Sequence, residues 1–174
     1  MNGNHENSSQ RRCWDWMVVS GTCHYAKDRS AFTTYHEVGK TVGHTMFPEQ
    51  TIFVAGIGTV ELNVRSSSED GTPDRLLVLE NVFHIPSAIC NGFISFVVYQ
   101  NTNGGNAHLG PDQFQGFDSD GMPLWCGQPF RRLQKLVLVG NPQGETYLPE
   151  GGHFSLSIYL SEVDLRTVLA AASQ

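Results

Sequence analysis

Three neighbouring side chains could do chemistry: the thiol of Cys23, the imidazole of His24 and the carboxylate of Asp28. A thiol nucleophile needs a base within hydrogen-bond reach, and that base needs a group that orients it. Neighbours in an extended chain point to opposite sides, so Cys23 and His24 do not pair by adjacency. If the chain turns after His24, Asp28 could orient the imidazole, and we take His24 and Asp28 as the candidate catalytic pair. The competing interpretation, favoured because no base–orienter geometry is visible, is that both residues only tie their loop to the next turn.

Other motifs of catalytic or metal-binding type fail on spacing. The segment AGIGTV at residues 55–60 lacks the third glycine and the helix of a dinucleotide site, and its glycines indicate a bend or bulge in a strand. The DSDG at residues 118–121 lacks the downstream glutamate of a calcium loop and is typical of a turn. The seven histidines show no H-E-x-x-H spacing. The sequence therefore predicts neither a metal nor a cofactor.

The composition excludes several classes of partner. The 174-residue chain has 17 acidic and 11 basic residues, a formal net charge of −6, and it lacks the basic patch that a nucleic-acid partner requires. The longest apolar runs, such as residues 92–99, are too short to span a bilayer. Residues 1–12 lack the apolar stretch of a signal peptide. Four widely spaced cysteines are typical of free thiols, and we expect a cytoplasmic protein.

Turn residues divide the chain into short strands and predict a mainly β fold. We expect residues 1–12 to be a disordered head and residues 13–174 to be a single β domain that ends in a helix. Ser161 can cap that helix, with Asp164 in its first turn and Val163, among others, available for packing. The expected strands are residues 16–19, 51–66, 75–85, 89–99, a hairpin at 114–125, and 132–140; residues 100–112 are expected to form a surface loop.

Several motifs follow one another in a fixed order between residues 14 and 91. The apolar WDWMVV runs into Ser20-Gly21-Thr22, and His24 and DRSAFTTY (28–35) follow; GIGTV (56–60), LENVFHIP (79–86) and Cys90-Asn91 come later. In this order they resemble the protease domain of copia-type retrotransposon polyproteins. The resemblance implies a closed β-barrel of the retropepsin type, usually a homodimer, whose cleft lies on the two-fold axis under a hairpin flap.

The catalytic aspartate of that family is missing here. It falls on Val19 by alignment to Ser20-Gly21, or on Val18 by counting back from His24, because the loop is one residue shorter. An aspartic protease uses two carboxylates that share one proton and activate a water, and valine can do neither. Asp15 lies further up the strand, about 10 Å away at ~3.3 Å per residue. The chain thus resembles a stand-alone, fungal-type relative that has lost its acid, and we do not expect an active aspartic protease.

Removal of the acid predicts a drier cleft, and an apolar cleft with a few polar groups is the usual form of a small-molecule site. Residues 36–50 are the expected lid over this cleft. The candidate substrate-binding residues are Val18, Val19, Ser20, Thr22, Cys23, Met46, Phe47 and Phe53.

Three functions remain open at this stage. The first is a repurposed, cofactor-free enzyme or binder that acts on a hydrophobic small molecule, for example by cyclisation or isomerisation in a biosynthetic pathway, with His24 as acid, base or donor. The second is a catalytically inert protein-interaction module that recruits a partner through the old dimer surface or peptide cleft. The third is a residual peptidase that uses another acid. The expected partners are a hydrophobic small molecule and a second copy of the chain, with no nucleic acid and no membrane.

Overall fold

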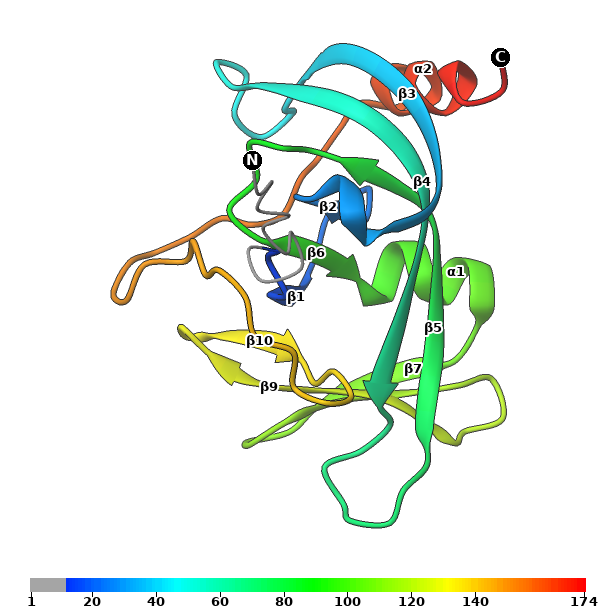
Figure 1. Cartoon of the computed structure of the whole chain (residues 1–174), viewed down its shortest axis with the longest axis vertical. Helices are drawn as coiled ribbons and strands as arrows, with labels where there is room; N and C mark the ends of the chain where they lie inside the picture. Colours follow the sequence, from blue (N-terminus) through cyan, green and yellow to red (C-terminus); the bar gives the residue numbers. More distant parts are fainter. Residues whose placement is uncertain (1–11) are drawn as a thin grey trace, which may run out of the picture.

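A computed structural model describes residues 12–174, so the predicted head, residues 1–12, lies outside the described residues apart from Arg12. Within this range the protein is mainly β and ends in a helix, as the sequence predicts (Figure 1). The strands are β1 (Trp16–Val19), β2 (Tyr25–Ala26), β3 (Phe32–Gly43), β4 (Thr51–Arg65), β5 (Asp74–His84), β6 (Asn91–Ile94), β7 (Asn106–Leu109), β8 (Phe114–Phe117), β9 (Pro123–Phe130) and β10 (Leu133–Leu136). The helical segments are η2 (Arg29–Ala31), η3 (Ser95–Tyr99), α1 (Gln100–Asn103) and α2 (Glu162–Ala171).

The strands form one sheet in the order β3-β4-β5-β2-β6-β1-β10-β9-β8-β7. Neighbouring strands are antiparallel except for two parallel pairs, β1 with β6 and β2 with β5. The resemblance predicts a closed barrel, whereas this sheet is open, with β3 and β7 at its edges. Next to the β3 edge, α2 packs against both β3 and β4. A single bridge, Val64 with Leu138, links β4 to the chain just after β10.

β3 and β4 form a long hairpin whose tip, residues 44–50, belongs to the expected lid. β4 then turns through residues 66–73 into β5, at the predicted Asp70-Gly71 turn. The register between β4 and β5 shifts after Gly58, which confirms the predicted bulge. A Cβ on Gly58 would lie 1.9 Å from the Thr34 carbonyl oxygen. Only glycine therefore lets β3 approach β4 this closely.

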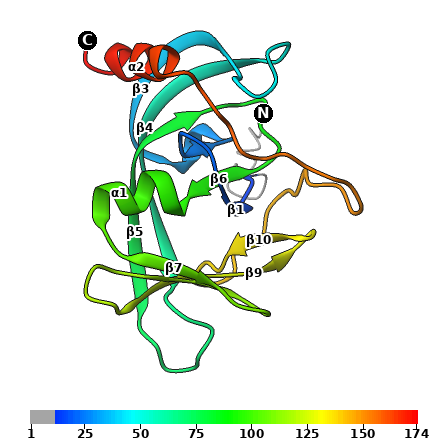
Figure 2. The same ribbon diagram turned by 180° about the vertical axis from the view of Figure 1, so that it is seen from behind.

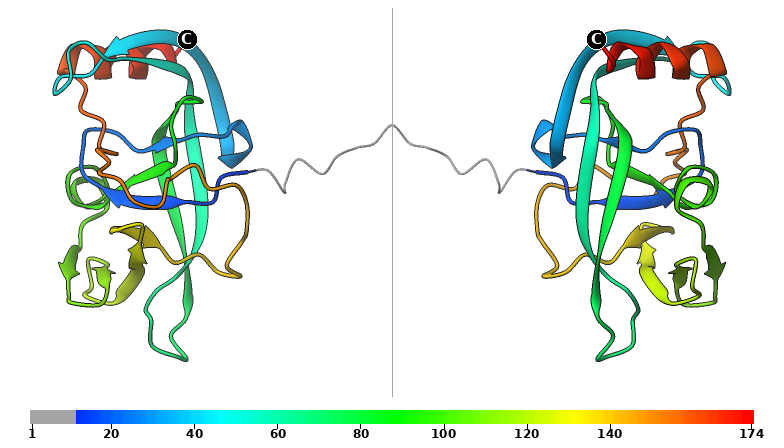
Figure 3. Two further views of the ribbon diagram at one scale, coloured as in Figure 1. Left: turned by 90° about the vertical axis from the view of Figure 1, so that its left-hand side faces the viewer. Right: turned by 90° about the vertical axis from the view of Figure 1, so that its right-hand side faces the viewer.

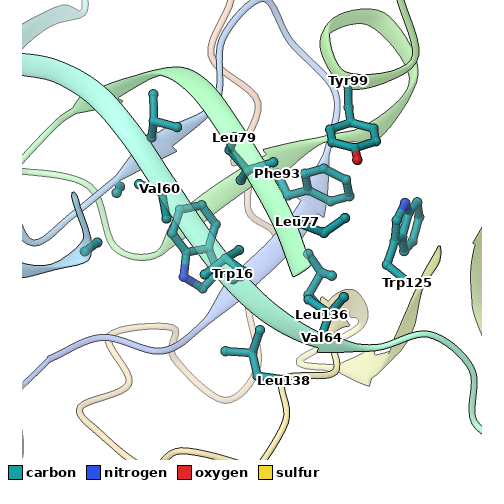
Figure 4. Packing of buried hydrophobic residues seen from close by; sticks show 14 of the residues in the cluster. Trp16, Val60, Val64, Leu77, Leu79, Phe93, Tyr99, Trp125, Leu136 and Leu138 are labelled. Atoms are coloured by element: carbon teal, nitrogen blue, oxygen red, sulfur yellow. The ribbon is translucent and has the colours of Figure 1, made fainter. Parts of the chain in front are cut away.

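The concave side of the sheet holds an aromatic core (Figure 4). The alternation in β4 is as predicted, because Val60 and Val64 are buried while Glu61 between them is exposed. The rings of Phe93 and Trp125 meet edge to face with centroids 5.2 Å apart, a geometry that contributes about 1 kcal/mol beyond area burial. The cluster receives side chains from β1, β4, β5, β6 and β9. It therefore fixes the position of β1, and with it the point at which the loop after β1 begins.

The C-terminal arm, which we define as residues 155–174, crosses the molecule to α2 on the far side of the β3–β4 hairpin (Figure 2). The Ser161 hydroxyl accepts a hydrogen bond from the Asp164 amide at 3.1 Å, so the predicted cap is confirmed. Val168 is fully buried against the sheet. The predicted packing of Val163 is wrong: its side chain is 73% exposed, because it lies on the outer face of α2.

Two sequence predictions fail locally between β6 and β8. The predicted strand at residues 89–99 ends at Ile94, and η3, a π-helix, follows and leads into α1 (Figure 3). Phe96 and Val97 are about half exposed on η3, so an apolar run here does not mean a buried strand. The predicted loop at residues 100–112 contains the edge strand β7. Between Arg12 and Gln174 there is no helix with the length and apolar character needed to cross a membrane.

Candidate functional site

β1 ends at Val19, and the loop that follows it carries no carboxylate. Val18 packs against the core cluster that contains Trp16, whereas Val19 packs against a second cluster that contains Met17. Both valines are half-buried. Because they serve opposite sides of the strand, they do not form together the apolar floor that the sequence predicts.

The C-terminal arm lies directly on this loop. Ile158 pairs with Gly21 in a parallel bridge, and its carbonyl oxygen accepts a hydrogen bond from the Thr22 amide at 2.9 Å. The Thr22 hydroxyl donates to the same carbonyl at 3.3 Å and accepts from the Leu160 amide at 3.0 Å. Gly21 has a φ of +123°, and a Cβ there would lie 2.5 Å from the Ile158 carbonyl oxygen. Glycine at this position is therefore what lets the arm approach.

The hydroxyl of Ser20 connects the loop to the arm through side chains. Its Oγ lies 2.9 Å from the Ser157 Oγ and 2.8 Å from the Tyr159 hydroxyl. Ser20 was predicted to line a substrate pocket, but here its hydrogen bonds are made with the chain's own residues. The loop thus offers both its backbone and its hydroxyls to one extended segment.

The tip of the β3–β4 hairpin contacts the other side of the same segment (Figure 2). The amide of Thr45 donates to the Tyr159 carbonyl at 2.9 Å. The Nδ1 of His44 accepts from the Met46 amide, so its Nε2 carries the proton and donates to the Ser157 carbonyl at 3.2 Å. Residues 156–160 therefore lie between the Ser20–Thr22 loop and the hairpin tip, in a space that we call the cleft.

Only part of the expected lid faces the cleft. Phe47 is half-buried, with its ring 5.0 Å from that of His44, and it lines a pocket of about 320 Å³ beside the arm. Met46 is 63% exposed and Phe53 is 49% exposed. These two residues were predicted to bind substrate, and neither of them lines this pocket.

His24 is buried behind the loop, not in the cleft. Its Nδ1 accepts a hydrogen bond from the Ile94 amide at 3.0 Å, and its ring stacks on Phe93. Burial lowers the pKa of His24 from 6.5 to about 4, so the imidazole is neutral near pH 7 with its proton on Nε2. His24 also lines a small pocket of about 190 Å³ between β5, η3 and α1. A neutral imidazole can donate a hydrogen bond there, whereas its low pKa opposes a role as acid or base.

The other two chemical candidates have structural partners. Cys23 is 3% exposed, and burial raises the pKa of its thiol to about 12, which leaves no thiolate to act as a nucleophile. Asp28 accepts a hydrogen bond from the Cys13 amide at 2.8 Å. The structure thus gives His24 and Asp28 separate partners: the first holds β6, and the second holds the segment before β1. In residues 12–174 no three His, Cys, Asp or Glu side chains are grouped so as to hold a metal ion.

The remaining motif residues build a corner behind the cleft. The guanidinium of Arg29 lies 3.8 Å above the Tyr35 ring, and the Tyr35 hydroxyl lies 2.7 Å from Nδ1 of His84. Asn91 is 1% exposed; its Oδ1 accepts from the Lys27 amide at 2.8 Å and its Nδ2 donates to the Cys13 carbonyl at 3.0 Å. We call this set the corner; its residues are Cys13, Asp15, Lys27, Asp28, Arg29, Tyr35, His84 and Asn91.

Residues 16–104, just over half of the chain, match the family of Pol polyprotein β-barrel domains. The chain belongs to this family. A transposon-type polyprotein origin is therefore shown, as the resemblance predicts. Comparisons with curated proteins and with solved structures gave no match. The matched range contains most of the corner and the Ser20–Thr22 loop, whereas β7 to β10 and the C-terminal arm lie outside it.

Asp15 has a structural role in this Pol β-barrel domain. Its side chain is 4% exposed, and Oδ1 lies 2.8 Å from Nζ of Lys135 on β10. Its Oδ2 is buried with no hydrogen-bond partner. The carboxylate, which directly precedes β1, thus joins the start of β1 to β10, which lies outside the family match. The residues of β1 itself include no carboxylate.

Sequence reasoning missed the residues that contact the arm from the rest of the Pol β-barrel domain. His44 and Thr45 lie within the predicted lid, but nothing in their types distinguishes them from loop residues. Tyr25, whose hydroxyl donates to the Leu156 carbonyl at 2.6 Å, reads as an ordinary strand residue. The one usable signal was the alternation Leu156, Ile158, Leu160 with polar residues between, which is typical of a strand with one buried face.

Proposed function

We propose that this Pol β-barrel domain is a non-proteolytic, retropepsin-like protein-interaction module, descended from a transposon protease, whose cleft holds an extended peptide without cutting it. The observation that carries the proposal is the seating of residues 156–160 between the Ser20–Thr22 loop and the hairpin tip. Peptide recognition by strand addition uses backbone hydrogen bonds for affinity and alternate side chains for specificity. Both features are found here. Backbone carbonyls of the arm accept hydrogen bonds from the loop and from the hairpin tip, and the side chains of Leu156 and Leu160 are buried, with 8% and 5% exposed.

The chemistry of the cleft favours binding over hydrolysis. Val18 and Val19 take the positions where an acid is expected, and Asp15 is paired with Lys135. A water between valines has no base to take its proton and no acid to supply one. The hydroxyls and amides that remain in the cleft, on Ser20 and Thr22, are hydrogen-bonding groups suited to a peptide backbone.

The test is an NMR titration of the intact, isotope-labelled chain with short peptides that carry apolar residues at alternate positions. We expect the amide signals of Thr22 and Thr45 to shift, and mass spectrometry to show that the peptides stay intact. Peptides with proline at the central position are the matched control, because proline lacks the amide hydrogen of a strand residue. Cleaved peptides, or shifts that map elsewhere, would show that the proposal is wrong.

A second candidate, the small-molecule function, is favoured by the pocket beside His24. Its walls include Val78, Leu79 and Val98, and a neutral imidazole lines it. A small, uncharged carbonyl compound suits such a pocket, since Nε2–H can donate to its oxygen. Binding would raise the melting temperature of the intact chain by mass action. The His24→Asn variant keeps an acceptor for the Ile94 amide but lacks Nε2, so it should lose the ligand-induced shift. If no compound at high excess shifts the wild-type chain, this candidate is excluded.

Oligomeric state is a separate part of the proposal. The resemblance predicts a homodimer with a shared cleft, yet both walls of this cleft and the segment within it come from one chain. We therefore expect peptide binding by the monomer. Light scattering across a range of concentrations, with and without peptide, measures this directly, and binding seen only in a dimer fraction would contradict it.

A further inference from the structure

We propose that the C-terminal arm is a displaceable, self-supplied occupant of the cleft, so that an extended segment of a partner protein binds by exchanging with residues 156–160. This inference rests on the proposed function and adds its regulation. It predicts that the intact chain binds peptides weakly and that release of the arm makes the cleft available.

The contacts that hold residues 156–160 are of a kind that another peptide can reproduce. Four successive backbone carbonyls of the arm accept hydrogen bonds from cleft groups. The donors, in order from Leu156 to Tyr159, are the Tyr25 hydroxyl, the His44 Nε2, the Thr22 amide and the Thr45 amide. Carbonyl oxygens are present in every peptide, so this recognition depends on extended shape more than on sequence.

The burial of the arm also differs from that of a core strand. Ser157, Ile158 and Tyr159 are half-buried, whereas Trp16, Met17 and Ile94 on β1 and β6 are fully buried. Leu156 and Leu160 are the two apolar anchors, one at each end of the segment. Such spacing resembles a bound peptide with two anchor pockets, not a strand at the centre of a sheet.

The connection that precedes the arm allows it to leave. Residues 141–154 contain neither helix nor strand, and most of them are exposed. The connection is anchored by Leu148, which is 3% exposed, by the Glu145 amide, which donates to the Arg12 carbonyl, and by the ion pair of Glu150 with Arg131. A short connection without helix or strand presents a tethered ligand at an effective concentration on the order of millimolar. A free peptide must compete with the tethered arm. The arm therefore lowers the apparent affinity of the cleft for the peptide and leaves the intrinsic affinity of the cleft unchanged.

The experiment measures binding of a fluorescein-labelled peptide with the sequence of residues 154–161 by fluorescence anisotropy. The full-length Leu160→Asp variant places a charge at an arm anchor and leaves every cleft residue unchanged. Val163→Asp, on the exposed face of α2, is the matched control. We expect Leu160→Asp to bind the peptide at least about tenfold more tightly than the wild-type chain and than Val163→Asp, given a millimolar effective concentration of the arm.

A second variant covers the case in which Leu160→Asp does not fold. A protease site introduced in the exposed segment 149–153 allows the folded chain to be cut, with both pieces kept in solution. Exchange of the cut arm for labelled arm peptide, with the signals of Asn91 and Trp125 unchanged, supports the inference. Unfolding on loss of the arm, or a cut arm that never exchanges, would overturn it, because the arm would then be part of the core.

The two proposals fail in different ways. If the labelled arm peptide exchanges but no unrelated extended peptide binds, the arm is displaceable and the interaction-module function is wrong. If unrelated peptides shift the amide signals of Thr22 and Thr45 in the wild-type chain while the amide signals of residues 156–160 do not move, the function stands and the displacement is wrong.

Discussion

In both the corner and the cleft, polar groups hold backbone groups of another segment by hydrogen bonds. The two regions differ in which part of the chain supplies that segment. In the corner, Asn91 and Asp28 hold backbone groups of Cys13 and Lys27, and all of these except Cys13 lie within the family-matched range, residues 16–104. In the cleft, Thr22 and Thr45 hold backbone groups of residues 156–160, which lie far outside that range. The corner is thus held mostly by residues of the family-matched range, and the cleft is filled by a segment from outside it.

This difference separates the residues that hold the fold together from those that contact the arm. The corner motif residues that gave the resemblance, such as Arg29 and Tyr35, serve structure and are intact. Val19, where the resemblance predicts an acid, is half-buried and packs against the second core cluster. Under the proposed function, the loop after β1 is the receptor for an extended backbone.

The largest expected effect lies where the corner is joined to β10. In Lys135→Met, the buried Asp15 carboxylate loses its partner, which costs about 3–5 kcal/mol of unfolding free energy. Asp15→Asn should cost less, because Lys135 is 20% exposed and its ammonium can reach water. Urea unfolding followed by fluorescence measures both. A Lys135→Met variant as stable as Asp15→Asn would show that the pair does not join the two parts.

The second prediction concerns Asn91 at the centre of the corner. Asn91→Ala removes the partners of the Lys27 amide and the Cys13 carbonyl, and two unsatisfied groups cost about 3 kcal/mol in total. Asn106→Ala, at an exposed position on β7, is the matched control and should leave stability unchanged. Chemical denaturation compares them. An unfolding free energy equal to that of the control would mean that the corner is not held by this side chain.

The fold was more predictable from the sequence than the site. Alternation identified β4, the Asp70-Gly71 turn identified the hairpin of β4 with β5, and Ser161 identified the start of α2, because these signals are local. The cleft was not predictable, since Thr22 and Ile158 are more than a hundred residues apart and neither has an unusual neighbourhood. His24 and Asp28 were paired by spacing, but strand pairing placed the first against β6 and the second against Cys13. Apolar content misled at η3, where Phe96 and Val97 are about half exposed.

The third prediction uses pH to probe His24, which lies between the two regions. Its pKa is about 4 in the folded chain against 6.5 when unperturbed, so the unfolded chain binds more protons between these values. The contribution of His24 to the free energy of unfolding is therefore fully present above the unfolded pKa and is lost as the pH drops towards 4. The loss is about 2 kcal/mol between about pH 7 and pH 5. Burial lowers the pKa of His84 as well, with the same sign.

The His24→Asn variant isolates this contribution. Asparagine can accept the Ile94 amide and does not titrate, so its stability should fall less than that of the wild-type chain over the same pH range. Thermal unfolding of both proteins at matched ionic strength gives the comparison. Parallel pH profiles would mean that His24 is solvated in the folded chain. The proposed role of its imidazole as a buried hydrogen-bond donor in the adjacent pocket would then be wrong.

The smallest effect is expected in the cleft, and it is the one that separates the two regions most cleanly. Thr22→Val keeps the shape of the side chain and removes the hydroxyl that bonds Ile158 and Leu160, at a cost of about 1 kcal/mol. Thr41→Val, at an exposed position on β3, is the control. Hydrogen exchange at the Leu160 amide should accelerate in Thr22→Val alone, while exchange at the Asn91 amide stays at the wild-type rate. If both amides accelerate together, the arm and the corner unfold as one cooperative unit, and the cleft is then a part of the core that merely resembles a binding site.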